Sequence, residues 1–332
     1  MLSNKSHEGV LHNYAPRLVA FEYTTSPDTS NKPNSLLFIG GLTDGLETVP
    51  YVSKIAQALE PTEWSLFSLL LSSSYGGWAV GSLDNDVEEI AQCVEYVKKV
   101  KGSHGKVVVM GHSTGSQDVL HYLHSPNPLP RSEGYDSGLQ HLVRPVLDGA
   151  IMQAPASDRE ALIATLKKNP ELQGVFDELV ALAKSEPYTT GKTGDTLPLA
   201  LTAKLDFPPD TAISGRRFLS LASPDSPERP APDDLFSSDL SDERLLQTFG
   251  AVGSRGLLRS KLMALYSGED EFAAPWIEKE KLLERWSVAA DANGENKWDH
   301  GDSGVIAGAS HNVKDVGQGD LITQVLNYLS RV

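Results

Sequence analysis

Apolar residues occur along the chain in short runs that are separated by longer amphipathic stretches. Runs rich in valine, leucine and isoleucine are typical of buried strands in a parallel sheet. Such runs predict strands at residues 18–23, 35–39, 64–71, 107–110, 144–152, 261–267 and 305–307. Apolar residues at helical spacing predict helices at 51–59, 86–100, 276–287 and from 320 onward, and a further helix after Gly115 that carries Val119, Leu120 and Leu123. This alternation predicts an α/β fold, with a mostly parallel central sheet and helices on both of its faces.

The segments around the first strands and helices carry weaker patterns. Residues 1–16 have the composition of a loosely ordered arm, and residues 25–34 have that of a turn. Asp84 or Asp86 is expected to cap the helix at 86–100.

The alternating pattern stops after Pro155, and about a hundred residues separate two strands of the predicted sheet. Helices are expected at 158–168, where Ser157 and Glu160 form a capping-box pattern, and at 171–184. The segment 185–240 is rich in Pro, Asp and Ser. An insertion of this length predicts a cap over the sheet. The expected domains are therefore 1–155, first part of the α/β core; 156–258, inserted cap; and 259–332, second part of the core. Arg216 and Arg217 lie in the cap, where they could meet an anionic substrate group or simply face solvent.

The strand at 107–110 leads directly into Gly111-His112-Ser113-Thr114-Gly115, and a helical pattern follows. A Gly-x-Ser-x-Gly sequence between a strand and a helix is the pattern of a nucleophile elbow, in which a sharp turn presents the serine hydroxyl above the sheet. The glycines leave room for the neighbouring strand and helix. The alternative is an ordinary turn in which Ser113 only caps the helix.

Two further loops that follow predicted strands carry the partners that a serine nucleophile needs. Asp270 and Glu271 follow the strand at 261–267, and His311 follows the strand at 305–307. The carboxyl ends of parallel strands share one edge of the sheet, so these loops are expected to converge on Ser113. The order serine, acid, histidine is that of α/β-hydrolases. An imidazole would take the serine proton, and a carboxylate would orient that imidazole.

The sequence offers alternatives for both the acid and the histidine. The spacing from Gly268 favours Glu271 as the acid, so Asp270 and Glu271 both remain candidates. His112 is expected to point away from Ser113, and His300 has no strand before it. His121 and His124 have the spacing of metal ligands but no third ligand, so no metal site is expected.

A tetrahedral intermediate needs two backbone N–H donors for its oxyanion. Thr114, the residue after the candidate nucleophile, is expected to supply one of them. Gly41 or Leu42, in the glycine-rich loop after the strand at 35–39, is expected to supply the other.

Composition limits the possible partners. The net charge of −15 disfavours nucleic acid and anionic membranes. The single cysteine, Cys93, excludes an internal disulfide and a cysteine-rich zinc site, and it is expected to be a small buried residue. No secretory signal or membrane-spanning run is evident, so a cytoplasmic location is expected. The sequence leaves the oligomeric state open.

Several motifs together resemble those of a fungal and plant family of α/β-hydrolases that was long described as of unknown function. They are residues 12–22 (HNYAPRLVAFE), 38–45 (FIGGLTDG), 74–78 (SYGGW), 111–117 (GHSTGSQ) and 270–272 (DEF). The family includes fungal esterases of fusarinine-type siderophores. The resemblance implies an α/β-hydrolase fold and a cytosolic esterase without a cofactor. Its substrate would be a hydroxamate siderophore, cleaved to hydroxyacyl-ornithine units so that iron is released.

In this family the order Asp-Glu-aromatic selects Asp270 as the acid. Ala273-Ala274 before Pro275 is one residue longer than the family pattern, which leaves the acid open. The function expected from the sequence is a serine esterase with Ser113, His311 and Asp270 as its triad. Two alternatives stay open: a non-catalytic binding protein for a small molecule on the same fold, and a lipase- or acyltransferase-type serine enzyme. The polar character of 185–240 disfavours a lipase lid.

Overall fold

The computed structural model describes residues 6–24, 32–102, 104–131, 138–185, 188 and 195–332. Eight strands form one sheet in the order β1-β2-β4-β3-β5-β6-β7-β8. Their bounds are β1 Gly9–Ala15, β2 Leu18–Tyr23, β3 Asn34–Ile39, β4 Trp64–Leu69, β5 Val107–His112, β6 Gly149–Gln153, β7 Leu262–Ser267 and β8 Gly304–Ile306. The strands β1 and β2 run antiparallel to their neighbours, and all the others pair in parallel. The predicted α/β class and mostly parallel sheet are confirmed.

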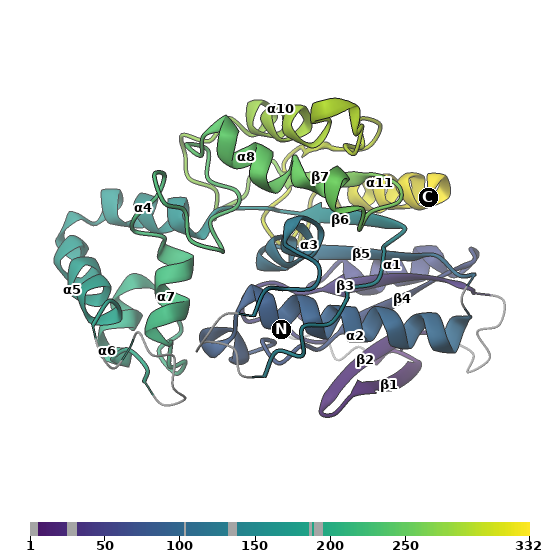
Figure 1. Cartoon of the computed structure of the whole chain (residues 1–332), viewed down its shortest axis with the longest axis horizontal. Helices are drawn as coiled ribbons and strands as arrows, with labels where there is room; N and C mark the ends of the chain where they lie inside the picture. The colour runs from purple at the N-terminus through teal and green to yellow at the C-terminus, as the bar shows by residue number, and fades with distance from the viewer. Residues whose placement is uncertain (1–5, 25–31, 103, 132–137, 186–187, 189–194) are drawn as a thin grey trace.

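Helices cover both faces of the sheet (Figure 1). One apolar cluster joins the sheet to α2 Leu83–Lys101, α3 Thr114–His124 and α10 Lys279–Ala290. A second cluster, on the opposite face, joins it to α1 Val52–Leu59 and α11 Gln318–Arg331. Both faces of the central strands are therefore covered by apolar side chains, which explains why β3, β4, β5 and β7 are buried at every position.

A separate group of helices stands to one side of the sheet (Figure 1, left). It contains α4 Asp158–Lys168, η2 Pro170–Leu172, α5 Gln173–Ala183, α6 Leu199–Thr202, η4 Ala203–Leu205 and α7 Gly215–Ala222. These helices share their own apolar cluster, to which η1 Gly77–Val80, between β4 and α2 in the chain, also contributes. The later helices α8 Asp242–Thr248 and α9 Ala251–Arg255 instead contribute to the cluster around α3 and α10, and η5 Ala292–Gly294 follows α10. The domain boundaries at 156 and 258 remain a prediction.

Several local expectations need correction. Part of the expected arm, residues 9–15, is a strand that pairs with β2. Ser82, and not Asp84 or Asp86, caps α2, because its hydroxyl accepts the Asn85 N–H. The strand expected at 144–152 is limited to Gly149–Gln153. Most of the expected turn at 25–34 lies outside the described residues. Among the residues that the structure describes, no helix combines the length and apolar character needed to cross a bilayer.

Candidate active site

Ser113 lies at the junction between β5 and α3, in backbone geometry that is rare for a residue with a side chain. Its φ is 55° and its ψ is −121°. Its backbone N–H donates a hydrogen bond to the carbonyl of Gln153 at the end of β6, with an N···O distance of 2.9 Å. Strained conformations of this kind persist where the surrounding structure fixes them, and they concentrate at functional sites. The expected strand–turn–helix context of a nucleophile elbow is present.

The glycines around Ser113 are required by close backbone contacts. A Cβ atom on Gly111 would lie 2.0 Å from the carbonyl oxygen of Gly115, and one on Gly115 would lie 2.6 Å from the carbonyl oxygen of Ile39. A Cβ atom on Gly41 would lie 2.7 Å from Cβ of Ser113. The loop after β3 therefore packs directly against the elbow, as the predicted oxyanion site requires.

Asp270 and Glu271 both contact His311, but at different atoms. The carboxylate oxygens of Asp270 lie 2.8 and 2.9 Å from His311 Nδ1. The Glu271 carboxylate instead accepts the backbone N–H of His311, at 2.8 Å. The imidazole of His311 is thus paired with Asp270, and its Nε2 is the ring nitrogen left for a further partner.

The ring of His311 lies in a buried and partly aromatic environment. Phe272 meets it edge-on, with ring centroids 4.8 Å apart, and His112 lies on another side, with centroids 4.9 Å apart. Both His311 and Asp270 are buried. The described part of the structure contains no hydrogen bond between the Ser113 hydroxyl and His311. Such bonds are often long before a substrate binds.

One of the two alternatives for the second oxyanion donor is already engaged. The Gly41 N–H donates to the side chain of Asp44, with an N···Oδ2 distance of 2.8 Å. Of these two alternatives, Leu42 is therefore the one whose N–H has no partner among the described hydrogen bonds. Thr114 is the first residue of α3, where backbone N–H groups lack partners within the helix.

A cavity of about 810 Å³ lies between this site and the separate helices. Leu42 lines it beside Glu271 and Phe272, and Trp276 and Lys167 line another part of its wall. The ammonium of Lys167 lies 3.8 Å from the ring centroid of Trp276. The walls thus combine aromatic surface with groups of both charges, which suits an amphipathic organic molecule.

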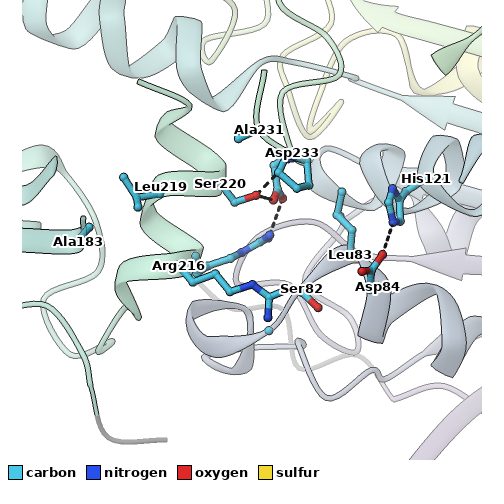
Figure 2. Close-up of a pocket in the computed structure, with 13 residues that line it drawn as sticks. Ser82, Leu83, Asp84, His121, Ala183, Arg216, Leu219, Ser220, Ala231 and Asp233 are labelled. Atoms are coloured by element: carbon cyan, nitrogen blue, oxygen red, sulfur yellow. Dashed lines mark hydrogen bonds and ion pairs between the residues drawn. The ribbon is translucent and has the colours of Figure 1, made fainter. Parts of the chain in front are cut away.

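Arg216 and Arg217, which could meet an anionic substrate group or face solvent, line a different cavity. Figure 2 shows this cavity of about 350 Å³, between α7 and the start of α2, with Arg216 on its wall. Arg217 is buried and forms an ion pair with Asp233. Burial raises the pKa of nearby Asp86 to about 7 and that of Asp158 to about 6. Because it pairs with buried Asp233, Arg217 compensates a carboxylate charge inside the protein and is not free to bind a substrate.

The remaining candidates have partners that explain them. His121 pairs with Asp84 (Figure 2), and His300 pairs with Asp291. Cys93 is buried, as expected, and burial raises the pKa of its thiol. Within the described residues, no group of three or more His, Cys, Asp and Glu side chains is arranged to hold a metal ion.

Gln153 is a residue of this site that the sequence analysis missed. It is fully buried at the carboxyl end of β6 and contacts groups from four other segments of the chain. The strand predicted at 144–152 ends one residue before Gln153, and no local pattern marks this residue because its partners are distant in sequence.

The chain is similar to several known proteins over almost its whole length. A family model described as "Protein of unknown function (DUF1749)" matches residues 1–330. Fusarinine C esterase sidJ of Aspergillus fumigatus is 50% identical, and the match covers 97% of this chain and 95% of the relative. Esterase AN6793 of Emericella nidulans is 47% identical, and the match covers 99% of this chain and 94% of the relative.

The solved structure of siderophore hydrolase EstB from Aspergillus fumigatus superposes with a TM-score of 0.85 at 48% identity. The match covers 99% of this chain and 98% of EstB. A protein of unknown function with the alpha/beta hydrolase fold matches with a TM-score of 0.55 at 12% identity, over 100% of this chain and 97% of its own. The chain therefore has the α/β-hydrolase fold.

Proposed function

Because the chain belongs to the DUF1749 family, and its relatives include named siderophore and fusarinine C esterases, we propose that it is a serine esterase. Its substrate is an ester of a hydroxamate siderophore, and it acts in the cytoplasm. The observation that carries the proposal is the pairing of Asp270 with His311 Nδ1, on the same sheet edge as the strained Ser113.

In the first half of the reaction, the Ser113 hydroxyl attacks the ester carbonyl carbon while His311 Nε2 takes its proton. Asp270 holds Nδ1 and stabilises the imidazolium that forms. The N–H groups of Leu42 and Thr114 stabilise the oxyanion. The intermediate collapses as His311 returns the proton to the leaving alcohol, which gives an acyl-enzyme and a free alcohol.

In the second half, a water molecule attacks the acyl-enzyme carbonyl, and His311 takes its proton. The acid product leaves, and Ser113 regains its hydroxyl hydrogen. These steps use groups of the chain and water alone. Iron, when present, belongs to the siderophore as cargo.

The cavity beside Leu42 and Phe272 is the proposed substrate site. Its volume of about 810 Å³ lies within the range of small-molecule sites. Lys167, Glu271 and Asp158 give its walls charge, so a polar ester fits it better than a long acyl chain does.

The test combines active-site labelling with product analysis. The wild-type protein is incubated with a fluorophosphonate, and the labelled peptide is identified by mass spectrometry. Label on Ser113, and its loss in Ser113→Ala, are expected. A fusarinine-type siderophore should yield its hydroxy acid products with wild type and none with Ser113→Ala.

Simple aryl esters and long-chain esters complete the panel. Faster hydrolysis of the long-chain esters would support a lipase-type enzyme instead. Tight binding of the siderophore without label or product would support a binding protein.

A further inference from the structure

The side-chain amide of Gln153 connects the elbow at Ser113 to the loop that carries His311. Its Oε1 lies 2.7 Å from the Tyr51 hydroxyl and 2.5 Å from His112 Nδ1. Its Nε2 lies 3.1 Å from Ser267 Oγ and 3.4 Å from the carbonyl oxygen of His311. We propose that Gln153 is a positioning residue that fixes His311 relative to Ser113. This inference rests on the proposed function.

The partners define the orientation of the amide. The carbonyl of His311 can only accept a hydrogen bond, so the amino end of Gln153 faces it. The oxygen end therefore faces Tyr51 and His112. Since an amide oxygen can only accept, Nδ1 of His112 carries a proton that it donates to Gln153.

The second nitrogen of His112 extends the connection to the residue after His311. Asn312 Oδ1 lies 2.8 Å from His112 Nε2. Burial and the neighbouring His311 lower the pKa of His112 to about 4, so its ring is neutral near pH 7. A neutral ring protonated at Nδ1 accepts at Nε2, and a 180° rotation of the Asn312 amide supplies the donor. The only carboxylate near this ring among the described ion pairs is that of Asp44, 3.9 Å from Nε2.

Backbone bonds complete the arrangement. The carbonyl of Gln153 accepts the Ser113 N–H and also the hydroxyl of Ser116, at 3.0 Å. One residue thus holds the backbone of the candidate nucleophile with its carbonyl and the backbone of the candidate base with its amide. His112, neutral and locked between Gln153 and Asn312, places no positive charge beside the imidazolium that His311 forms during the reaction.

The main test replaces Gln153 with an apolar side chain of similar length. Gln153→Met should lower kcat by about 100-fold and change KM by less than about threefold, because a shift of about 1 Å in a reacting group costs a factor of this size. Fluorophosphonate labelling of Ser113 should slow by a similar factor. The amount of Ser113 labelled at completion gives the concentration of folded enzyme, so that kcat can be calculated per folded molecule. Unchanged kcat in folded Gln153→Met overturns the inference.

Asn34→Leu is the matched control. Asn34 is a buried amide at the amino end of β3, far from the site, where its Oδ1 accepts the Lys106 N–H at 3.0 Å. Its replacement should lower the melting temperature and leave kcat per labelled site unchanged. An equal loss of kcat in Asn34→Leu and Gln153→Met would show a general structural effect and overturn the inference.

A double-mutant cycle with Asn312→Ala tests the connection through His112. If Gln153 and Asn312 act through one network, the double variant should be no more than about threefold slower in kcat than the slower single variant. If the double variant instead loses the product of the two single-variant factors in kcat, the two residues act independently, which would contradict the connection.

If Gln153→Met does not fold, Asn312→Ala alone should still lower kcat about tenfold at little cost in melting temperature. A wild type that is neither labelled nor active would overturn the proposed function; an active wild type with unaffected variants overturns only this inference.

Discussion

Asp270 Oδ1 lies 2.8 Å from His311 Nδ1, and the second oxygen of the same carboxylate lies 2.9 Å from that nitrogen. This pairing gives Nδ1 the proton and leaves Nε2 as the acceptor that a base requires. Glu271, the next residue, accepts the backbone N–H of His311. The two adjacent acids therefore have separate tasks: one orients the ring, and the other anchors its loop.

Replacing each acid by its amide should separate these tasks. Asp270→Asn should lower kcat by about 10³- to 10⁴-fold, because the amide favours the wrong tautomer of His311. Glu271→Gln keeps an oxygen that can accept the backbone N–H, so its kcat should fall less than about tenfold. Steady-state hydrolysis of an aryl ester gives both values. The reverse ranking would identify Glu271 as the acid.

The elbow glycines should be intolerant of even one added methyl group. In Gly115→Ala the new Cβ would lie 2.6 Å from the Ile39 carbonyl oxygen and 2.7 Å from that of Gly40. We expect a loss of about 2 kcal/mol or more in the free energy of unfolding. Urea denaturation measures it. Gly76→Ala is the control, since no atom lies within 4 Å of its new Cβ, and it should be near neutral. Equal effects would contradict the steric argument.

The parts of the fold that were predicted correctly are those where local pattern and burial coincide. Strands such as β3 and β5 are covered on both faces, so each contains four consecutive apolar residues, 36–39 in β3 and 107–110 in β5. The strand β1 was missed because it lies at the sheet edge and is half exposed, with Leu11 61% exposed. Its apolar pattern is correspondingly weak.

The candidate site was predicted as far as chain order and strand ends allow. Those features brought Ser113 and His311 to one edge of the sheet. They could not choose between Asp270 and Glu271, because adjacent side chains differ only in direction. Nor could they identify Gln153, whose side-chain partners lie 41 to 158 residues away in the chain.

Buried Asp86 should make stability depend on pH. Burial raises its pKa from 3.8 to about 7, so the folded protein binds a proton there that the unfolded chain has released. Its contribution to stability is fully present below pH 3.8 and is lost as pH rises to about 7. Between these values the free energy of unfolding should fall by up to about 1.4 kcal/mol per pH unit for this group.

Asp86→Asn removes the titrating group and should flatten this part of the profile. Urea denaturation at several values between pH 5 and pH 8 measures the slope for both proteins. The difference in the free energy of unfolding between wild type and Asp86→Asn should be greatest above pH 7, where the variant should be the more stable. Parallel profiles would show that Asp86 does not titrate in this range.

The carboxylate of Asp44 should determine how well the oxyanion is held. It accepts the Gly41 N–H at 2.8 Å, while its own N–H donates to the Gly41 carbonyl at 3.0 Å. These two bonds close the turn that contains Leu42, whose N–H is the proposed oxyanion donor. In Asp44→Ala the turn loses the first bond, and we expect kcat to fall about 10- to 100-fold, with a smaller change in KM.

Asp44→Asn separates this role from charge, because its amide oxygen can still accept the Gly41 N–H. Its kcat should stay within about threefold of wild type. Inactivation by a fluorophosphonate should slow in Asp44→Ala in proportion to kcat, since the phosphonyl oxygen occupies the same position as the oxyanion. If Asp44→Asn is as slow as Asp44→Ala, the charge near His112 matters more than the turn, because both variants lack the carboxylate that lies 3.9 Å from His112 Nε2.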